Sequence, residues 1–368
     1  MSVKPNIRKI LVICPYPEGV AATQRLKYEQ YFDTWKKDGF DITISPFFSI
    51  NTWNILYEDG NLIKKIVGTI QGYFKRLKDI FRIRKYEKIY VCMWVTPFFD
   101  TFFERIFFCL TPNIIYDFDD AIHVEEDPSA KNSFRSFFKS KKKVNLLIKK
   151  SCHVITSSPF NLDYCVKNNQ SGLATYIPCS LDVKRFLPKC MEHNNTKISI
   201  GWTGTFSSKS YLDSISDVLR SVCLKLDIKL VLITNFDYVI KDIDMEVIKW
   251  SERTEISDLQ KIDIGLYPIM PSNWALGKGG LKVLQYMAIG IPSISTNFGT
   301  ATKIVSNGID GFLVDTLDEW IQKISLLVKD ENLRKEMGHK GREKIIEKYS
   351  VEAVSKSYLS VLNQSQFE

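Results

Sequence analysis

The chain has 368 residues, of which 45% are hydrophobic and 25% are charged, and its formal net charge at pH 7 is +8. This composition suffices for two packed domains of roughly 150–200 residues each and excludes an intrinsically disordered protein. Because no window approaches about 18 uninterrupted apolar residues, and the short apolar run at the N-terminus ends at prolines, we expect a cytoplasmic protein without a membrane span or a cleaved signal.

The first half of the chain alternates short apolar segments, rich in β-branched residues, with helical patterns. Such segments are typical of parallel strands that are buried on both faces. The expected strands cover residues 9–15, 41–47, 88–95, 113–118 and 153–158. The clearest helical pattern runs from about Asn61 to Arg84 and carries one row of apolar residues. This row consists of Ile63, Ile66, Val67, Ile70, Phe74, Leu77 and Phe81.

The turn after the first expected strand, Pro17–Leu26, is rich in small residues and opens a helix. Small residues let a ligand approach the backbone closely. Arg25 in this turn is a candidate for holding an anionic ligand group such as a phosphate. The alternative is an ion pair on the helix surface with Glu29, four residues further on.

The excess positive charge is concentrated in the segment Lys131–Lys150, which contains no acidic residue and has apolar residues at helical spacing. A basic amphipathic stretch of this kind suits an anionic membrane surface, where each cation contributes about 1 kcal/mol. We therefore expect the first domain to dock on the inner face of the cytoplasmic membrane. The alternative is that the apolar side chains pack on the sheet while the lysines remain in water. We expect no binding of nucleic acid, since no recognised reading motif accompanies the charge.

The second half repeats the strand and helix alternation, with expected strands at residues 198–204, 229–234, 263–268, 291–296 and 311–314. This alternation specifies parallel sheets with right-handed crossovers. The chain is therefore predicted to be an α/β protein of two doubly wound, Rossmann-like domains, residues 1–182 and 183–346, that face a central cleft. In such folds ligands bind at the carboxyl ends of the strands.

The stretch Gly277–Pro292, GKGGLKVLQYMAIGIP, places a glycine-rich turn directly before a short helix. A helix beginning at Gly279–Gly280 would aim several unpaired backbone N–H groups and the positive end of its dipole at one point. Lys278 and Lys282 flank that point, which suits a diphosphate. The alternative is an ordinary turn between a helix and a strand of a doubly wound domain.

Five segments between Gly201 and Ser350 resemble, in order, the family 4 (group 1) glycosyltransferases of the GT-B fold. They read GWTGTFSSKSYL, SDLQKIDIGLYPI, GKGGLKVLQYMAIGIPSIST, IVSNGIDGFLV and LRKEMGHKGREKIIEKYS. The first half resembles the family more faintly, through PYPEGVAATQRLKYEQYF, YDFDDAI and HVITSSPF. The resemblance implies a retaining enzyme that uses a nucleotide-sugar, and a last helix within residues 347–368 that crosses back onto the first domain. The QYMA variant with its lysines resembles a sub-branch that acts in bacterial surface polysaccharide synthesis (capsule, O-antigen or exopolysaccharide).

Four positions depart from the family pattern. Many relatives carry two glutamates eight positions apart, where this chain has Gly277 and Gln285. A glutamine still accepts and donates hydrogen bonds to ribose hydroxyls, whereas Gly277 has no side chain to contact the donor sugar. Lys278 is then expected to face the sugar or the phosphates. Thr205 replaces an arginine of the family, and Lys209 lies about one residue out of register with the usual lysine.

The resemblance implies a transfer that needs no metal and no cofactor, in which the leaving diphosphate assists removal of the acceptor proton. Positive groups near the leaving diphosphate lower the barrier. We assign Lys278 and Lys282 to this role, although a lysine on a solvated helix surface is the alternative for Lys282 and for Lys209. The predicted donor-binding set comprises Arg25, Gly204, Thr205, Lys209, Gly279, Gly280 and Gln285.

The loop after the expected strand at residues 113–118 supplies two further candidates, Asp119 and His123. Asp117–Phe118–Asp119 forms a D-x-D, which holds a divalent metal in the GT-A fold, but the surroundings of that fold are lacking. Asp119 or Asp120 is instead expected to cap the next segment or to point towards an acceptor hydroxyl. Relatives place a histidine in this region against the donor sugar, and the alternative for His123 is a surface or capping role. Since the cysteines and histidines are scattered, we expect no metal site.

These observations predict a hexosyltransferase-type enzyme that transfers a sugar from a UDP- or GDP-sugar to a glycan or lipid-linked acceptor. A sugar-nucleotide epimerase of the same architecture is an alternative, which requires cleft carboxylates for acid–base work. A non-catalytic GT-B partner protein is a second alternative, suggested by Gly277. A dinucleotide-dependent dehydrogenase is disfavoured because GWTGT lacks the full G-x-G-x-x-G pattern.

Overall fold

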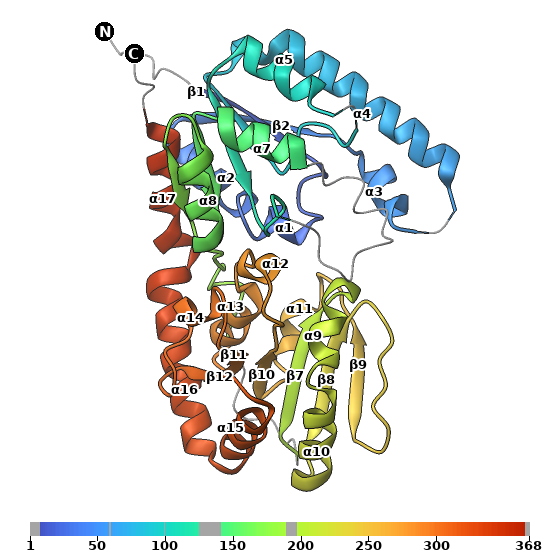
Figure 1. Ribbon diagram of the computed structural model, residues 1–368, viewed down its shortest axis with the longest axis vertical. Coiled ribbons are helices and arrows are strands. Elements are labelled where there is room, and N and C mark those ends of the chain that lie inside the picture. The colour runs from blue at the N-terminus through green and yellow to red at the C-terminus, as the bar shows by residue number, and fades with distance from the viewer. Residues whose placement is uncertain (1–7, 59, 99, 125–140, 189–196, 365–368) are drawn as a thin grey trace. The chain divides into compact units, whose positions relative to one another are not determined.

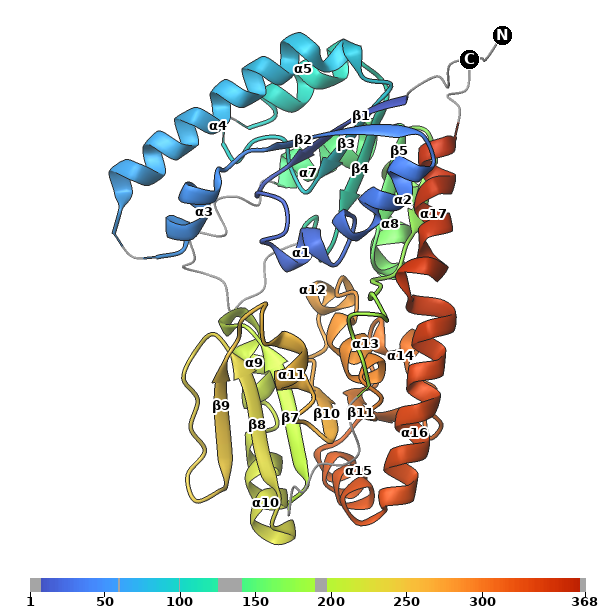
Figure 2. The same ribbon diagram turned by 180° about the vertical axis from the view of Figure 1, so that it is seen from behind.

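The computed structural model describes residues 8–58, 60–98, 100–124, 141–188 and 197–364. The chain divides into two compact units (Figures 1 and 2). Unit 1 comprises Met1–Pro178 together with Val354–Glu368, and unit 2 comprises Cys179–Ala353.

Unit 1 is built on a six-stranded sheet with the order β2-β1-β3-β4-β5-β6, in which all neighbours pair in parallel. The five strands expected in this half are confirmed, and a three-residue strand, β6, adds an edge that the sequence did not reveal. The strands are β1 (Arg8–Cys14), β2 (Phe40–Pro46), β3 (Lys88–Cys92), β4 (Ile114–Phe118), β5 (His153–Thr156) and β6 (Ala174–Tyr176). The strand β6 was missed because it is short and half-buried, and its sequence, ATY, contains no continuous apolar run.

Helices cover both faces of this sheet, with α4, α5 and α7 on one face and α2 and α17 on the other (Figures 1 and 2). The helices of unit 1 are α1 (Ala22–Arg25), α2 (Phe32–Lys37), α3 (Ile50–Leu56), α4 (Leu62–Arg82), α5 (Phe102–Leu110), α7 (Lys141–Lys150) and α8 (Pro159–Asn168). The last helix, α17 (Val351–Asn363), belongs to unit 1 from Val354 onwards. Its Tyr358 ring packs 4.5 Å from that of Tyr31, between ring centroids.

The basic segment Lys131–Lys150 is described only from Lys141, since residues 131–140 lie outside the described ranges. Within α7, Val144, Leu147 and Ile148 are buried in the core of unit 1. Lys143 is buried too, and its ammonium lies 3.8 Å from the Glu104 carboxylate and donates to the Thr96 carbonyl. The apolar side chains of α7 therefore pack inside the unit, which is the alternative interpretation of this segment.

Unit 2 has a second parallel sheet of six strands, in the order β12-β11-β10-β7-β8-β9. The five strands expected here are confirmed, and the half-exposed edge strand β9 was missed because its residues show no apolar run. The strands are β7 (Ser199–Gly204), β8 (Lys229–Thr234), β9 (Met245–Lys249), β10 (Ile264–Tyr267), β11 (Ser293–Thr296) and β12 (Gly311–Val314). Two parallel-sheet α/β domains are thus confirmed.

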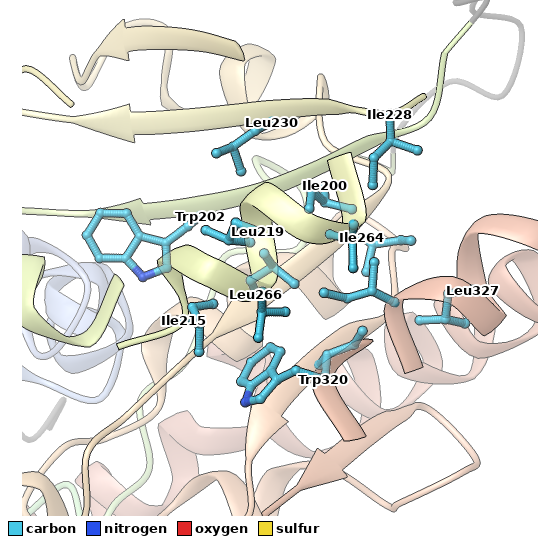
Figure 3. Packing of buried hydrophobic residues seen from close by; sticks show 14 of the residues in the cluster. Ile200, Trp202, Ile215, Leu219, Ile228, Leu230, Ile264, Leu266, Trp320 and Leu327 are labelled. Atoms are coloured by element: carbon cyan, nitrogen blue, oxygen red, sulfur yellow. The ribbon is translucent and has the colours of Figure 1, made fainter. Parts of the chain in front are cut away.

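The core of unit 2 lies between its sheet and the helices α10 and α15, where Trp202, Leu219 and Trp320 are buried (Figure 3). The helices of this unit are α9 (Lys209–Asp213), α10 (Ser216–Leu226), α11 (Glu255–Leu259), α12 (Asn273–Leu276), α13 (Leu281–Ala288), α14 (Ala301–Ile304), α15 (Leu317–Lys329) and α16 (Glu331–Lys344). Helix α13 packs closely on β10, and the absence of a side chain at Gly265 permits this. A Cβ atom at Gly265 would lie only 2.3 Å from the Tyr286 ring. The Tyr286 hydroxyl also accepts from the Thr203 N–H, which anchors α13 beside the end of β7.

Candidate functional site

The start of helix α13 is set by Gly280. This residue is the N-cap and has a φ of 73°, a left-handed conformation that glycine adopts without a steric penalty. A Cβ atom there would also lie 2.4 Å from Ile304 Cδ1. The helix begins at Leu281, one residue later than predicted, and its first turn leaves the N–H groups of Leu281, Lys282 and Val283 without acceptors inside the helix. These N–H groups and the helix dipole favour an anion at this end.

Lys282 lies in this first turn and is half-buried. Its ammonium is 3.3 Å from Ser208 Oγ and 4.5 Å from the centroid of the Trp202 ring. Burial lowers the Lys282 pKa to about 7, and the nearby charge of Lys278 lowers it further in the same direction. Among the described residues no carboxylate pairs with this ammonium, and the only charged group that acts on its pKa is Lys278. The contacts of the Lys282 ammonium, Ser208 and Trp202, are therefore neutral. A bound anion would stabilise the charged form of this lysine.

Gly204, at the end of β7, is brought next to Lys282 although the two lie far apart in the sequence. A Cβ atom at Gly204 would lie 2.8 Å from Lys282 Nζ and 2.3 Å from the Trp202 ring. Glycine is thus required for the ammonium to rest against the end of the strand. Unit 2 thus brings Gly204 of the predicted donor-binding set to Lys282, one of the two lysines assigned to lowering the barrier. Lys278, the other, is near enough to act on the Lys282 pKa.

Lys278 precedes the glycine pair in the loop between α12 and α13, and Gly279 lies between it and Gly280. Its ammonium is 5.8 Å from the centroid of the Trp274 ring. Gly277 is the C-cap of α12, with its N–H donating to the Trp274 carbonyl. The short helix thus ends at Gly277, one of the positions that depart from the expected family pattern, and Lys278 follows directly in the loop.

Two other predicted residues have local partners. The Lys209 ammonium pairs with the Asp213 carboxylate at 2.8 Å, one turn further along α9, and lies 5.1 Å from the Tyr238 ring centroid. The Thr205 hydroxyl is 2.9 Å from that of Ser207. The charge of Lys209 is therefore paired within α9. Ser208, which the sequence analysis did not single out, contacts Lys282.

Gln285 is buried on α13, and its side-chain amide donates to Glu255 Oε1 at 3.1 Å. Glu255 is itself buried, and its other oxygen lies 3.5 Å from Arg185 Nη2. Glu255 was missed because an acidic residue at the start of a helix is ordinary in a sequence. A carboxylate thus lies beside the glutamine that was expected to bind the ribose hydroxyls.

In unit 1, the D-x-D segment is split between two environments. Asp117 is buried in β4, where its carboxylate lies 2.5 Å from the Lys27 ammonium and accepts from the Tyr90 hydroxyl. Burial raises the Asp119 pKa to about 6, against the opposing effect of Lys27 and with a further increase from Asp120. Over the described residues, no three His, Cys, Asp or Glu side chains gather in an arrangement that would hold a metal ion.

His123 is buried, and its ring stacks on the Tyr164 ring with 4.0 Å between centroids. Burial lowers the His123 pKa to about 4, so the imidazole is neutral near pH 7. Neither ring nitrogen has a hydrogen-bond partner among the described residues. A neutral imidazole donates or accepts a hydrogen bond but is a weak general base at pH 7.

Arg25 is half-buried on the short helix α1. The Glu29 carboxylate accepts from the Gly19 N–H at 2.8 Å and from the Gln24 side chain at 2.9 Å. These bonds fix the small-residue turn against the start of α1. The charge of Arg25 acts on Glu29 as well, and lowers its pKa, although burial raises that pKa overall.

The low pKa of Lys282 predicts that anion binding weakens as the pH rises. A bound diphosphate would raise this pKa, because an opposite charge favours the ammonium. Above about pH 7 the free protein must take up a proton on binding, so affinity falls by up to about tenfold per pH unit until the pKa of the complex is reached. The dissociation constant of a diphosphate diester, whose own charge is constant, measured from about pH 6 to about pH 8.5 tests this.

The variant Lys282→Arg is the control, since a guanidinium stays charged over this range. Its binding profile should be flat, and an unchanged slope would show that another group titrates.

The lowered pKa of Lys282 also makes the free energy of unfolding depend on pH. The unfolded chain binds the Lys282 proton more tightly between about pH 7 and the ordinary pKa of 10.5, so the contribution of Lys282 to the free energy of unfolding rises with pH across that window.

Comparison with known proteins finds relatives of the segment that contains this site. Residues 191–344 match the family described as glycosyl transferases group 1. The chain is 35% identical over 85 residues to N-acetyl-alpha-D-glucosaminyl L-malate synthase of Bacillus anthracis, covering 22% of each protein. It is 34% identical over 89 residues to the capsular polysaccharide biosynthesis glycosyltransferase CapM of Staphylococcus aureus, covering 24% of this chain and 23% of CapM. The chain therefore spans about a fifth of the length of these curated relatives.

The fold extends beyond these local matches. The solved structure of Anabaena Alr3699/HepE in complex with UDP-glucose aligns with a TM-score of 0.66 at 12% identity, covering 96% of this chain and 99% of that one. At this identity the likeness shows the fold alone, and the predicted GT-B fold is confirmed. In the part of the chain that the structure describes, no helix combines the length and apolar character needed to cross a membrane.

Proposed function

With a group 1 glycosyl transferase domain at residues 191–344 as the premise, we propose that the protein is a glycosyltransferase that uses a UDP- or GDP-sugar. The observation that carries the proposal is the Lys282 ammonium, which lies against Gly204 at the first turn of α13 without a carboxylate partner among the described residues. This arrangement lies inside the segment that matches the family. It offers backbone N–H groups, a helix dipole and an ammonium to one anion.

The chemistry follows from charge. The bond between the anomeric carbon and the diphosphate oxygen breaks, and the leaving nucleoside diphosphate gains negative charge in the transition state. In this proposal the N–H groups of Leu281–Val283 at the start of α13 and the ammonium of Lys282 bind that charge as it develops. Lys278 adds positive charge nearby, as its effect on the Lys282 pKa indicates. In this proposal the acceptor hydroxyl oxygen forms the new bond to the anomeric carbon on the face that the diphosphate leaves, which gives retention. The leaving diphosphate assists removal of the acceptor proton, and no protein nucleophile takes part.

We propose that these groups neutralise the diphosphate without a metal ion. The acceptor is a glycan or a lipid-linked sugar, and the reaction belongs to surface polysaccharide synthesis. This part of the proposal is supported by CapM, a curated relative named for capsular polysaccharide biosynthesis.

Asp119 and His123 of unit 1 are proposed to contact the reacting sugars. The raised pKa of Asp119, about 6, makes its carboxyl a candidate to share the acceptor proton.

Nucleotide binding tests the proposal most directly. Melting temperatures of the full chain should rise with UDP or GDP and with UDP-glucose or GDP-mannose, since a ligand at 100 times its dissociation constant adds about 2.7 kcal/mol of stability. The rise should persist in EDTA. Absence of any shift with all four probes would contradict the proposed function. A shift that EDTA abolishes and manganese restores would show that a metal, rather than lysines alone, holds the diphosphate.

A further inference from the structure

Helix α4 (Leu62–Arg82) exposes the row of apolar residues that its sequence pattern places on one face. Phe81 is 85% exposed, Ile63 78% and Phe74 60%. Ile66, Val67, Ile70 and Leu77 complete the exposed row. An apolar row on a helix of a globular domain normally faces the core. Here the exposed fractions show that the row faces solvent instead. The helix itself lies at the edge of unit 1 (Figures 1 and 2).

The opposite face of α4 attaches the helix to unit 1 by small and charged residues. A Cβ atom at Gly68 would lie 2.3 Å from the Thr52 side chain, and one at Gly72 would lie 2.5 Å from the Phe47 ring. Close approach of the backbone therefore requires glycine at both positions. Among the large side chains of α4, the half-buried Tyr73 adds an aromatic contact to this attachment, with its ring 5.2 Å from that of Phe47 and 5.4 Å from that of Phe103, between centroids.

Arg76 and Asp79 hold this inner face in place. The buried Arg76 guanidinium donates to the carbonyls of Cys14, Ser45 and Val95, at the ends of β1 and β2 and just beyond β3. It also pairs with the buried Asp79 carboxylate at 3.0 Å. Rotating the helix to bury its apolar row would remove these donors and leave buried polar groups unpaired, which is costly. The outward direction of the row is therefore fixed by the fold.

Positive charge accompanies the exposed row. Between residues 62 and 85 there are eight lysines and arginines, and the single acid, Asp79, is buried against Arg76 and Arg82. Lys64 and Lys78 are exposed and lie beside the apolar row at helical spacing. Arg84 and Lys85 are exposed directly beyond its C-terminal end. The outer surface of α4 thus combines apolar side chains with cations.

We propose that α4 is an interfacial helix that lies in the surface of an anionic phospholipid membrane. Its exposed row, from Ile63 to Phe81, is roughly 27 Å long at the rise of an α-helix and lies on one side, so that it would enter the membrane at one depth. The flanking lysines would meet anionic headgroups. A second copy of the chain fits less well, because it would bring the same cations together. The inference is independent of the proposed nucleotide chemistry.

Vesicle binding of the full chain, without nucleotide, tests this proposal. Vesicles of phosphatidylcholine with about 30 mol% phosphatidylglycerol should bind the protein, and phosphatidylcholine vesicles should bind it at least about tenfold less. Replacing the row by the triple variant Ile63→Gln, Phe74→Gln and Phe81→Gln should reduce the partition coefficient at least tenfold. The double variant Lys64→Gln and Lys78→Gln should lower it severalfold and reduce its dependence on salt.

A matched control comes from unit 2, where Leu224, Leu317 and Ile346 are 55%, 53% and 49% exposed. The triple change of these residues to glutamine should leave vesicle binding unchanged. Circular dichroism should show that all variants keep their helix content. Equal binding to neutral and anionic vesicles, unchanged binding of the α4 triple variant, or no binding by the wild-type chain would each overturn the proposal. A wild-type dimer that the α4 variant dissociates would assign the row to a second copy instead.

Discussion

Replacing Lys282 with methionine is expected to lower kcat/KM for sugar transfer by about 10²–10³-fold, the usual effect of removing one group that stabilises developing negative charge. Methionine keeps much of the apolar stem that lies near Trp202 but removes the ammonium that contacts Ser208. The dissociation constant of UDP-glucose or GDP-mannose, whichever binds, should rise as well, because the diphosphate loses a cation. Calorimetric titration and steady-state kinetics measure the two effects.

Stability should not fall in this variant. Burial and Lys278 both lower the Lys282 pKa, which means that the fold disfavours the charged ammonium. Lys209→Met is the matched control, because the charge of the Lys209 ammonium is already paired with Asp213. Its affinity and turnover should stay within about threefold of the wild-type values, as expected for an exposed helix pair. A Lys282→Met variant with wild-type affinity and turnover would rule out the assigned role.

Replacing Arg76 with leucine is expected to lower the free energy of unfolding of unit 1 by about 3–5 kcal/mol, since removing one partner of a buried ion pair leaves the other poorly compensated. Asp79 would keep Arg82, which is 2.7 Å away and partly exposed, and the hydrogen bond that the Ser45 hydroxyl donates at 2.7 Å, but it would lose its buried cation. The carbonyls of Cys14, Ser45 and Val95 would lose their donor at the same time. Chemical denaturation gives the magnitude, and hydrogen exchange along β1, β2 and α4 shows whether the loss lies in unit 1.

Arg82→Leu is the control for the Arg76 prediction. Asp79 would remain paired with Arg76 at 3.0 Å, and Arg82 is 37% exposed, so the loss should be below about 1 kcal/mol. The double change Arg76→Met and Asp79→Leu should recover part of the loss, because it removes the unpaired buried charge. Wild-type stability of Arg76→Leu would show that the polar inner face of α4 does not hold the helix in place.

Helix α4 shows what an apolar pattern in the sequence can predict and what it cannot. The period of its apolar residues predicts a helix from about Asn61 to Arg84, and the structure has one from Leu62 to Arg82. Periodicity shows that the apolar residues share a face, but it does not show which face the rest of the domain contacts. That choice depends on Gly68, Gly72 and Arg76, whose partners come from distant strands and loops. Helix α7 shows the same limit, because its lysine-rich sequence does not reveal that Lys143 is buried.

The candidate site divides in a similar way. The glycine turn and Lys282 are adjacent in the sequence, and the local chemistry of a helix start was evident from them. Ser208 and Glu255 carried no signal, because each contacts α13 only through the fold. Lys209 and Lys282 look equivalent in the sequence, since both are lysines in short helices. Only Lys209, however, has an acidic residue one turn away, Asp213, with which it forms an ion pair.

By itself, the sequence determined the ten strands with continuous apolar runs, the two parallel-sheet domains and the segments that resemble group 1 glycosyltransferases. These features depend on local composition and period, which the order of residues contains directly. Only the tertiary structure decided that Gly204 meets Lys282, that the Lys282 pKa falls to about 7, and that α4 turns its apolar row outward. Each of these depends on desolvation and contact between residues far apart in the chain, and both arise only when the chain has folded.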